Sequence, residues 1–364
     1  MDLPPAGRDG PAGVMVTLGS DSHKRTHTLV AVDDNGQQQA QKTVPATTAG
    51  HLDAMQWALR WPERRWALED CRHVSRRLEA DLLVAGQLVV RVPPKLTVVA
   101  RRVARTSGKS DPIDALAVAR AALREPDLPV AKLDGPSRNV RLLLDHRDDL
   151  VGERTRTQNR LRWHLHELDP ETEIPARRLS RFRTLTELEQ RLQGVRGVVA
   201  EIALELIVRI REMTARINQL EVEIERRVRR LAPTLLELDG CGALCAAKVV
   251  GETAGIGRFR SRAAFAMNNG TAPVPVSSGN QRRHRLNRGG NRQLNVALHR
   301  IAITQLKGPG RARDYVTRRI AAGNTKTEAI RALRRRISDE VYRRLLHDER
   351  SRIDAGTNCS EAAA

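Results

Sequence analysis

Val14-Met15-Val16-Thr17-Leu18-Gly19-Ser20-Asp21 is an apolar run that ends in a carboxylate, and it is typical of a buried β-strand. A second run, Arg65-Trp66-Ala67-Leu68-Glu69, ends in the same way. Asp111 and Asp114 stand three residues apart at the start of an expected helix, so they share one helix face. Carboxylates at the ends of neighbouring strands, faced by a helix, form a site for hard divalent cations.

Each of these acids also has a purely structural interpretation. Asp111-Pro112-Ile113-Asp114 is a good helix start, with an N-cap, a proline at the first position and an acid at the third. Asp21 could belong to a solvated turn with Lys24 and His27, and Glu69 could be part of a surface pair with Asp70. The joint placement of the four acids within one α/β unit favours the metal site.

The charge of the chain indicates a polyanionic partner. The 364 residues carry a net charge of +20, and only eight of the 63 basic residues are lysine. A GC-rich genome would favour arginine over lysine, but it would not explain the positive surplus. Guanidinium groups bind phosphate oxygens bidentately, so nucleic acid is the expected partner. Aromatic residues make up only 2% of the chain, which favours backbone contacts to duplex or structured nucleic acid over stacking on single strands.

The composition also limits the class of protein. The length predicts two or three domains, and no apolar stretch is long enough to span a membrane. Residues 1–13 are expected to be a disordered leader without a signal peptide. The cysteines show no metal-binding spacing and are expected to be free cytosolic thiols: Cys71, Cys241, Cys245 and Cys359.

Residues 14–124 are expected to form a mixed sheet with helices on it. Strands ending near Ser20 and spanning 26–33 and 37–44 are followed by alternating helices and strands, with Asp34-Asn35-Gly36 as a hairpin turn. A proline-rich linker, 125–137, comes next. Residues 138–232 are expected to be helical, and their second helix has a heptad seam formed by Leu206, Ile210, Met213, Ile217, Leu220, Ile224 and Leu231. The partner of this seam is either the helix over 138–168 or a second protomer.

Residues 233–348 are predicted to form a mostly helical C-terminal domain, and 349–364 a frayed tail. Gly240-Cys241-Gly242 opens a helix over 243–253, which is typical either of a phosphate-binding turn or of an ordinary helix start. Residues 268–295 are expected to be a polar loop. Within it, Ser278, or its neighbour Ser277, is a candidate nucleophile, because nearby guanidinium groups would stabilise the charge that develops on a phosphate. A flexible basic loop without a catalytic serine has the same composition. His284 is either a base or a further phosphate contact.

These residues, taken in order, resemble the transposases of the insertion sequence 110 family over nearly the whole chain. The resemblance rests on Gly19-Ser20-Asp21-Ser22-His23-Lys24, Ala67-Leu68-Glu69, Lys109-Ser110-Asp111-Pro112-Ile113-Asp114-Ala115, Leu238-Asp239-Gly240-Cys241-Gly242, Asn269-Gly270-Thr271-Ala272-Pro273, Ser278-Gly279 and Gly289-Gly290-Asn291-Arg292. It implies a RuvC/RNase H-like domain of the "DEDD" type, a helical coiled-coil middle and a serine-bearing C-terminal domain.

The resemblance implies a recombinase that cuts and rejoins DNA strands at the ends of an insertion sequence and at its target. Asp21, Glu69, Asp111 and Asp114 would hold Mg²⁺ or Mn²⁺, and Ser278 would become covalently linked to DNA. A structured guide RNA, a dimer or tetramer and a cytoplasmic, nucleoid-associated location are also implied. The residues expected to contact nucleic acid are Lys24, Lys109, Gly240, Gly242, Arg282, Arg283, Arg285, Arg288, Asn291 and Arg292.

Two other functions remain open on the sequence. A RuvC-like nuclease that resolves branched DNA by water attack would need the same acids but no serine. An inactive copy would still bind nucleic acid through its basic helices and would not cut it.

Overall fold

The computed structural model of the protein describes residues 15–69, 73–103, 110–125, 128–133, 135–172, 174–175, 177–278 and 281–361, with the backbone alone at 102–103, 277–278, 281–283 and 356–361. The expected leader and Lys109 lie outside these residues, as do the side chains of Ser277, Ser278, Arg282 and Arg283. The chain divides into two compact units, residues 1–134 and 135–364, which are described one at a time.

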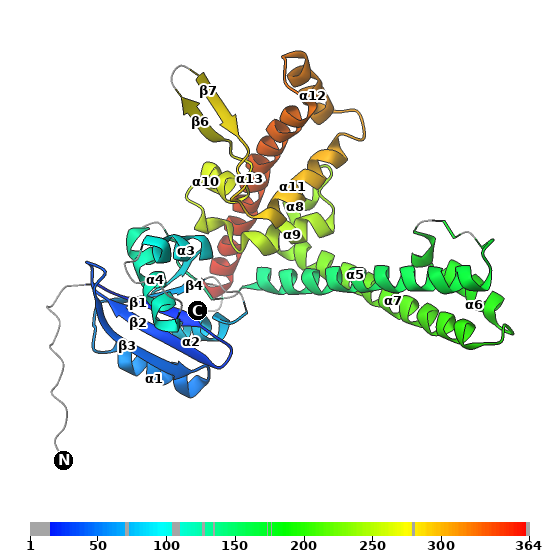
Figure 1. Cartoon of the computed structure of the whole chain (residues 1–364). Coiled ribbons are helices and arrows are strands. Elements are labelled where there is room, and N and C mark those ends of the chain that lie inside the picture. Colours follow the sequence, from blue (N-terminus) through cyan, green and yellow to red (C-terminus); the bar gives the residue numbers. More distant parts are fainter. Residues whose placement is uncertain are drawn as a thin grey trace. The chain divides into compact units, whose positions relative to one another are not determined.

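The first unit is built on a five-stranded sheet with the order β3-β2-β1-β4-β5 (Figure 1). Its strands are β1 Val16–Ser22, β2 Thr26–Val32, β3 Gln38–Pro45, β4 Arg64–Glu69 and β5 Val89–Val92. β2 pairs antiparallel with both β1 and β3, whereas β1, β4 and β5 run parallel. This topology is that of the RNase H-like folds, so the expected mixed sheet is confirmed.

Helices cover both faces of this sheet, as Figure 1 shows. The helices are α1 Thr48–Ala58, α2 Arg76–Val84, α3 Pro94–Val103 and α4 Asp111–Arg124. On one face, α1 and α2 pack against Leu18, Trp66 and other buried side chains of the sheet. On the other face, Ala67 and Val92 pack against α3 and α4. The apolar strands are therefore buried on both sides, as their near-continuous hydrophobic sequence predicts.

Gly19 brings α4 against the middle of β1. A Cβ atom at Gly19 would lie 2.2 Å from the carbonyl oxygen of Ala115 and 2.6 Å from the amide nitrogen of Ala119. No side chain fits in that space, so the helix backbone approaches the strand directly. Since α4 begins at Asp111, this contact also fixes where its first turn lies relative to the end of β1.

The second unit begins with a helical arm. It consists of α5 Pro136–Leu168, α6 Phe182–Leu192 and α7 Val198–Leu231. Arg147 of α5 pairs with Glu221 of α7 at 2.5 Å, and Glu153 with Arg209 at 3.6 Å, so α5 and α7 run antiparallel. The predicted seam of α7 is buried at its first six positions, and its partner helix is α5 of the same chain. α6 lies within the region 138–232 that was expected to be helical, and its Leu185 and Leu188 cover the end of the arm.

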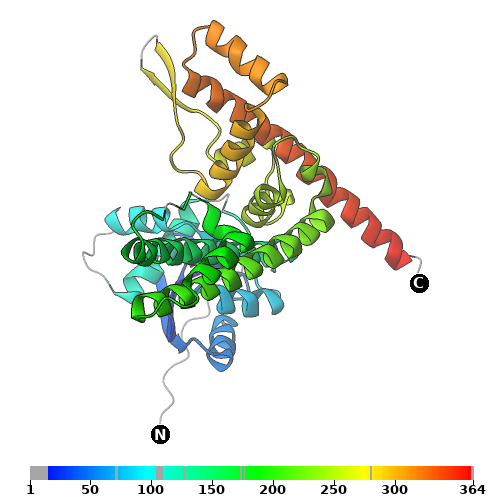
Figure 2. The ribbon, with the colours of Figure 1, turned by 90° about the vertical axis from the view of Figure 1, so that its right-hand side faces the viewer.

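The remainder of the second unit packs around the long helix α13, Lys326–Glu361 (Figure 2). This helix contacts α8 Pro233–Leu236, α10 Arg262–Asn268, α11 Arg292–Gln305 and α12 Arg311–Ala321. It continues through residues that the sequence analysis assigned to a tail. Within the described residues, no helix has the length and hydropathy required to cross a membrane.

The prediction of a loop over 268–295 is wrong for the centre of this segment, which forms a β-hairpin. The hairpin consists of β6 Val274–Ser278 and β7 Gln281–Arg285, which pair antiparallel. Only two apolar side chains, Val274 and Val276, alternate along β6, so the hydrophobic period was too short to detect. The dipeptide Gly279-Asn280 of the sequence is the signal from which this hairpin could have been predicted.

Candidate metal centre and nucleic-acid interface

The elements that carry the four predicted acids come together at the carboxyl end of the parallel strands. Asp21 lies at the end of β1, and β4 places Glu69 beside it, because Ser20 is level with Leu68. Side chains alternate along a strand, so Asp21 shares a face with Gly19, and Glu69 shares one with Ala67. That is the face covered by α4, whose first turn carries Asp111 and Asp114. The N-cap of α4 is Ser110, one residue before the predicted Asp111.

Two of the predicted acids form a close cluster with a histidine. The Nε2 atom of His23 lies 3.2 Å from Oδ2 of Asp21 and 3.4 Å from Oδ1 of Asp111. One ligand atom from each of the three residues falls within a common span of 4.8 Å. His23 follows β1 in a tight turn, which its backbone N–H closes by donating to the carbonyl of Thr26 at 2.9 Å. His23 is not among the site residues predicted from the sequence.

The electrostatics of the cluster favour a cation. Burial raises the pKa of Asp21, and the nearby carboxylates of Asp114 and Asp111 raise it further, while His23 opposes them. The Asp21 side chain is only 13% exposed, whereas those of His23 and Asp111 are about half-exposed at 51% and 53%. A bound cation would offset both the burial and the repulsion between the carboxylates.

The other two acids lie outside this close cluster. Asp114, with its side chain 16% exposed, accepts a hydrogen bond at 2.9 Å from Nη1 of Arg101 in α3. The carbonyl oxygen of Glu69 accepts a hydrogen bond from the Ser75 hydroxyl at 3.3 Å. Asp114 therefore has a cationic partner from the protein, and Glu69 stands at the strand end nearest Asp21.

The ligand atoms of the cluster suit a divalent ion that accepts both oxygen and nitrogen ligands. Carboxylate oxygens suit Mg²⁺ and Mn²⁺, and an imidazole nitrogen shifts the preference towards transition metals. Asp21 and Asp111 supply oxygen, and His23 supplies a nitrogen that is neutral when it binds metal. These residues fit Mn²⁺ or Mg²⁺, and Asp114 and Glu69 are the carboxylates that could complete the site.

In the second unit, the candidate serine lies at the tip of the β6–β7 hairpin. Ser278 pairs with Gln281, and Ser277 pairs with Arg282. At the other end of the hairpin is a hollow of about 540 Å³, lined by Val274, Arg285, Leu286, Asn287, Arg288 and Gly289. Arg285 and Arg288 are exposed, and neither forms an ion pair within the described part of the chain. Two of the predicted nucleic-acid contacts thus line one basic hollow.

The predicted Gly-x-Gly turn is at the start of α9, Ala243–Thr253. Gly240 has a positive φ of +76°, and a Cβ atom there would lie 2.9 Å from the carbonyl oxygen of Ile301 in α11. Gly242 is the N-cap of α9, with open space around it. Gly240 therefore has a packing role, whereas Gly242 presents the helix start to solvent. Lys24 and Arg292 are exposed.

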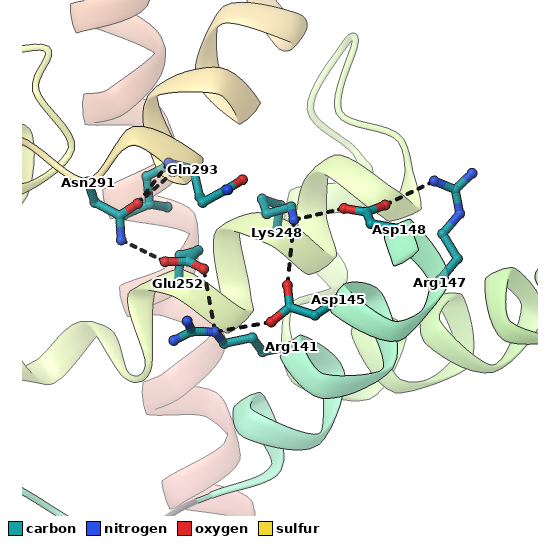
Figure 3. A network of polar contacts seen from close by, with 9 residues as sticks. Arg141, Asp145, Arg147, Asp148, Lys248, Glu252, Asn291 and Gln293 are labelled. Carbon is teal, nitrogen blue, oxygen red and sulfur yellow. Dashed lines mark hydrogen bonds and ion pairs between the residues drawn. The ribbon is translucent and has the colours of Figure 1, made fainter. Parts of the chain in front are cut away.

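Asn291, which was expected to bind nucleic acid, is engaged inside the protein. Its Oδ1 atom accepts from the backbone N–H of Gln293 and of Leu294, so it caps α11. Its Nδ2 atom donates to the buried Glu252 at 2.7 Å. Figure 3 shows the polar network that continues from there between α9 and α5, through Glu252, Arg141, Asp145, Lys248, Asp148 and Arg147.

A second set of amides anchors the base of the hairpin. Asn269 is fully buried and donates from Nδ2 to the Ser338 hydroxyl of α13 at 2.8 Å, while its Oδ1 accepts from Thr271. Asn287 donates to the carbonyl of Met267 at 3.0 Å. The backbones of Gly270 and Gly290 touch, since a Cβ atom at Gly290 would lie 2.3 Å from the Gly270 nitrogen. Both ends of the hairpin are thus held on α10 and α13.

Comparison with known proteins finds related sequences over both halves of the chain. The family model described as "Transposase", of the DEDD insertion sequence 110 type, matches residues 18–170, and the model "Transposase IS116/IS110/IS902 family" matches residues 232–317. The chain is 29% identical to the "Insertion element IS116 uncharacterized 44.8 kDa protein" of Streptomyces clavuligerus, over 92% of this chain and 95% of that protein. It is 26% identical to the "Insertion element IS900 uncharacterized 42 kDa protein" of Mycobacterium paratuberculosis, over 88% and 93%.

Among solved structures, T. thermophilus RuvC in complex with a Holliday junction substrate aligns with 30% of this chain and 94% of its own, at 16% identity and a TM-score of 0.24. The two family models match segments of both units, in the order that the sequence motifs predict. The chain belongs to the IS116/IS110/IS902 family of transposases and is a DNA transposase.

Proposed function

We propose that this transposase cuts and rejoins DNA by a metal-dependent reaction in which a serine is the nucleophile. The observation that carries the metal-dependent part is the cluster of Asp21, His23 and Asp111 at the end of β1. Asp114 and Glu69 stand at the same edge of the sheet and would complete the set of ligands. A bound Mg²⁺ or Mn²⁺ would stabilise the charge on the scissile phosphate and on the oxygen that leaves it.

The chain's own residues would prepare this site before DNA binds. The His23 imidazole lies between the carboxylates of Asp21 and Asp111, and Arg101 holds the carboxylate of Asp114 by a hydrogen bond at 2.9 Å. Because Gly19 fixes α4 on β1, the distance between the strand-end acid and the helix acids is set by backbone packing. This rigidity is what a site for in-line phosphoryl displacement requires.

The serine step is proposed for Ser278, with Ser277 as the alternative. Its hydroxyl oxygen would form an ester with the phosphorus, while the deoxyribose oxygen leaves with a proton, and the reverse reaction would rejoin the strands. The position at a hairpin tip supports this role, since the tip can approach a DNA backbone closely. Arg282, Arg283, Arg285, Arg288 and Arg292 would contact the phosphates.

The proposed partners follow from the charge of the chain and from the family resemblance. DNA ends and target would bind through Lys24, Lys109, Gly242 and the basic hollow at the hairpin base. A structured RNA would select the sites by base pairing, and assembly into a dimer or tetramer, with the helical arm in a coiled coil, would let acids of one protomer meet the serine of another. The reaction would take place in the cytoplasm, at the nucleoid.

The test incubates the protein with labelled element-end DNA, RNA from the element's flank and Mg²⁺ or Mn²⁺, and separates the products on a denaturing gel. We expect a protein-linked DNA band that is lost in both Ser278→Ala and Asp21→Asn. Asp34→Asn, at the exposed β2–β3 turn, is the matched control and should keep the band.

Cleavage without an adduct, unchanged in Ser278→Ala, would refute the serine step and point to a nuclease that uses water. A band that persists in Asp21→Asn would refute the metal site. No cleavage under any condition would leave an inactive copy or a missing cognate RNA, and repeating the assay with RNA recovered from the host would separate the two.

A further inference from the structure

The far half of α5 carries a basic face that has no role in the proposed chemistry. Between Glu153 and Glu167, the sequence contains four arginines and two histidines and no acidic residue. We define the α5 basic face as Arg156, Asn159, Arg160, Arg162, Trp163 and His166. It lies on the arm, where α5, α6 and α7 form a core of their own.

The arginines of this face are left without carboxylate partners, unlike other arginines of the same arm. Arg147, Arg183 and Arg211 each pair with a glutamate at 2.5 to 2.8 Å. Arg156 and Arg160 form no ion pair with any residue in the described ranges. Arg162 has a buried Nε atom that lacks a hydrogen-bond acceptor there as well. Unpaired guanidinium groups in one row favour an anionic partner.

An exposed tryptophan lies within this row. Trp163 is 73% exposed, whereas Trp57 and Trp66 of the first unit are 8% and 0% exposed. Together with Asn159, Arg162 and His166, it lines an open hollow of about 350 Å³. An exposed indole ring offers a flat face on which a base can stack, and neighbouring arginines add a cation–π contribution.

We propose that the α5 basic face binds a single-stranded segment of RNA, with one unpaired base stacked on Trp163 and the adjacent phosphates on Arg156 and Arg160. Duplex DNA keeps its bases stacked inside the helix, so it would leave the indole unused. The loops of a folded RNA present unpaired bases that aromatic side chains can stack on. The inference rests on the proposed RNA partner and assigns that RNA a place on the protein.

The site provides its own spectroscopic reporter. The full-length protein is titrated with a short oligouridylate, and the quenching of tryptophan fluorescence is followed. We expect quenching that disappears in Trp163→Ala together with an affinity loss of roughly 5- to 100-fold, the range for one stacked base. Trp163→Phe should recover most of the affinity, because the phenyl ring still stacks.

The arginines are tested through the salt dependence of binding. Arg156→Gln and Arg160→Gln should each lower the slope of log affinity against log salt by about 0.7, as expected for one phosphate of a single strand. Arg183→Gln is the matched control, since Arg183 lies on the same arm and already pairs with Glu187 at 2.8 Å. It should leave the affinity for oligouridylate unchanged within about twofold.

The outcomes separate this inference from the proposed function. RNA binding that is the same in Trp163→Ala and wild type would overturn the α5 site and leave the RNA partner intact. Failure of the wild type to bind any RNA would overturn both. Stronger quenching by oligothymidylate than by oligouridylate would replace RNA with single-stranded DNA and overturn the inference. A changed molecular mass of Trp163→Ala in sedimentation, without a change in RNA binding, would instead identify the face as a contact between copies of the chain.

Discussion

Replacing Gly19 with alanine should strain the whole candidate metal centre. The new Cβ atom would lie 2.2 Å from the carbonyl oxygen of Ala115, 2.6 Å from the nitrogen of Ala119 and 2.8 Å from its Cβ. Ordinary contacts between such atoms are about 3.5 Å, so α4 must move by about 1 Å or more. Overpacking costs about 1–3 kcal/mol, and the upper end applies because helix backbone cannot rotate away as a side chain can.

The assay uses the distribution of tryptophans. Trp57, Trp61 and Trp66 lie in the first unit, so in a Trp163→Phe background the fluorescence reports the unfolding of that unit alone. We expect Gly19→Ala to lower the free energy of unfolding in urea by about 3 kcal/mol. Asp111 and Asp114 move with α4, so the affinity for Mn²⁺ should fall about tenfold.

Gly86→Ala is the control for the loss of a glycine in the same unit. Gly86 has a φ of +70° and no atom within 4 Å of a built Cβ, so alanine there costs only backbone strain, about 1 kcal/mol. It should leave Mn²⁺ binding unchanged. If Gly19→Ala lost less than Gly86→Ala, or kept the wild-type Mn²⁺ affinity, the argument that backbone contact positions the acids would be wrong.

Three further predictions concern stability. Burial, with the charges of His51 and His23, lowers the pKa of His27 to about 4, below its ordinary value of about 6.5. The unfolded chain therefore takes up the proton first, and the free energy of unfolding falls by up to about 3 kcal/mol as the pH drops from 6.5 to 4. Urea unfolding at both ends of this pH range checks the prediction, and an equal pH dependence in His27→Gln would contradict it. Asn269→Ala leaves the buried Ser338 hydroxyl and Thr271 without their partner, so it should lower the free energy of unfolding in urea by about 1–3 kcal/mol. The double variant with Ser338→Ala should recover part of this loss, and no recovery would mean that Asn269 and Ser338 are not coupled. Asn291→Ala removes the cap of α11 and the bond to Glu252, so it should lower the free energy of unfolding by about 1–2 kcal/mol and with it the melting temperature. The affinity for DNA in a filter-binding assay should stay within about twofold of the wild type. A loss of DNA affinity without a loss of stability would support Asn291 as a nucleic-acid contact.

The elements that the sequence predicted well are those with a strong local signal. The strands of the first unit and the helix over 243–253 were predicted nearly to the residue, because apolar runs and glycine or proline breaks mark their ends. The seam of α7 was predicted by its heptad spacing. That spacing could not choose the partner helix, since the same apolar surface suits a helix of this chain or of another.

The parts that the sequence could not predict depend on contacts between distant residues. His23 was visible only as one residue of a motif, and its role appears when α4 brings Asp111 to within 3.4 Å of its Nε2 atom. Asn291 was predicted as a nucleic-acid contact from its place in a motif of the family resemblance. Its cap on α11 and its bond to Glu252 were not visible there, because they depend on where α9 and α11 lie.

Because the base of the β6–β7 hairpin is anchored, the length of its strands sets how far its tip lies from that base. Each residue of a strand advances the chain by about 3.3 Å, so the four steps from Val274 to Ser278 carry the tip about 13 Å from its base. Removing or adding one residue in a single strand would reverse the faces of the ladder beyond it. Changing both strands together by two residues would preserve the faces and move Ser278 by about 7 Å, so the strand length sets how far the proposed nucleophile lies from the anchored base.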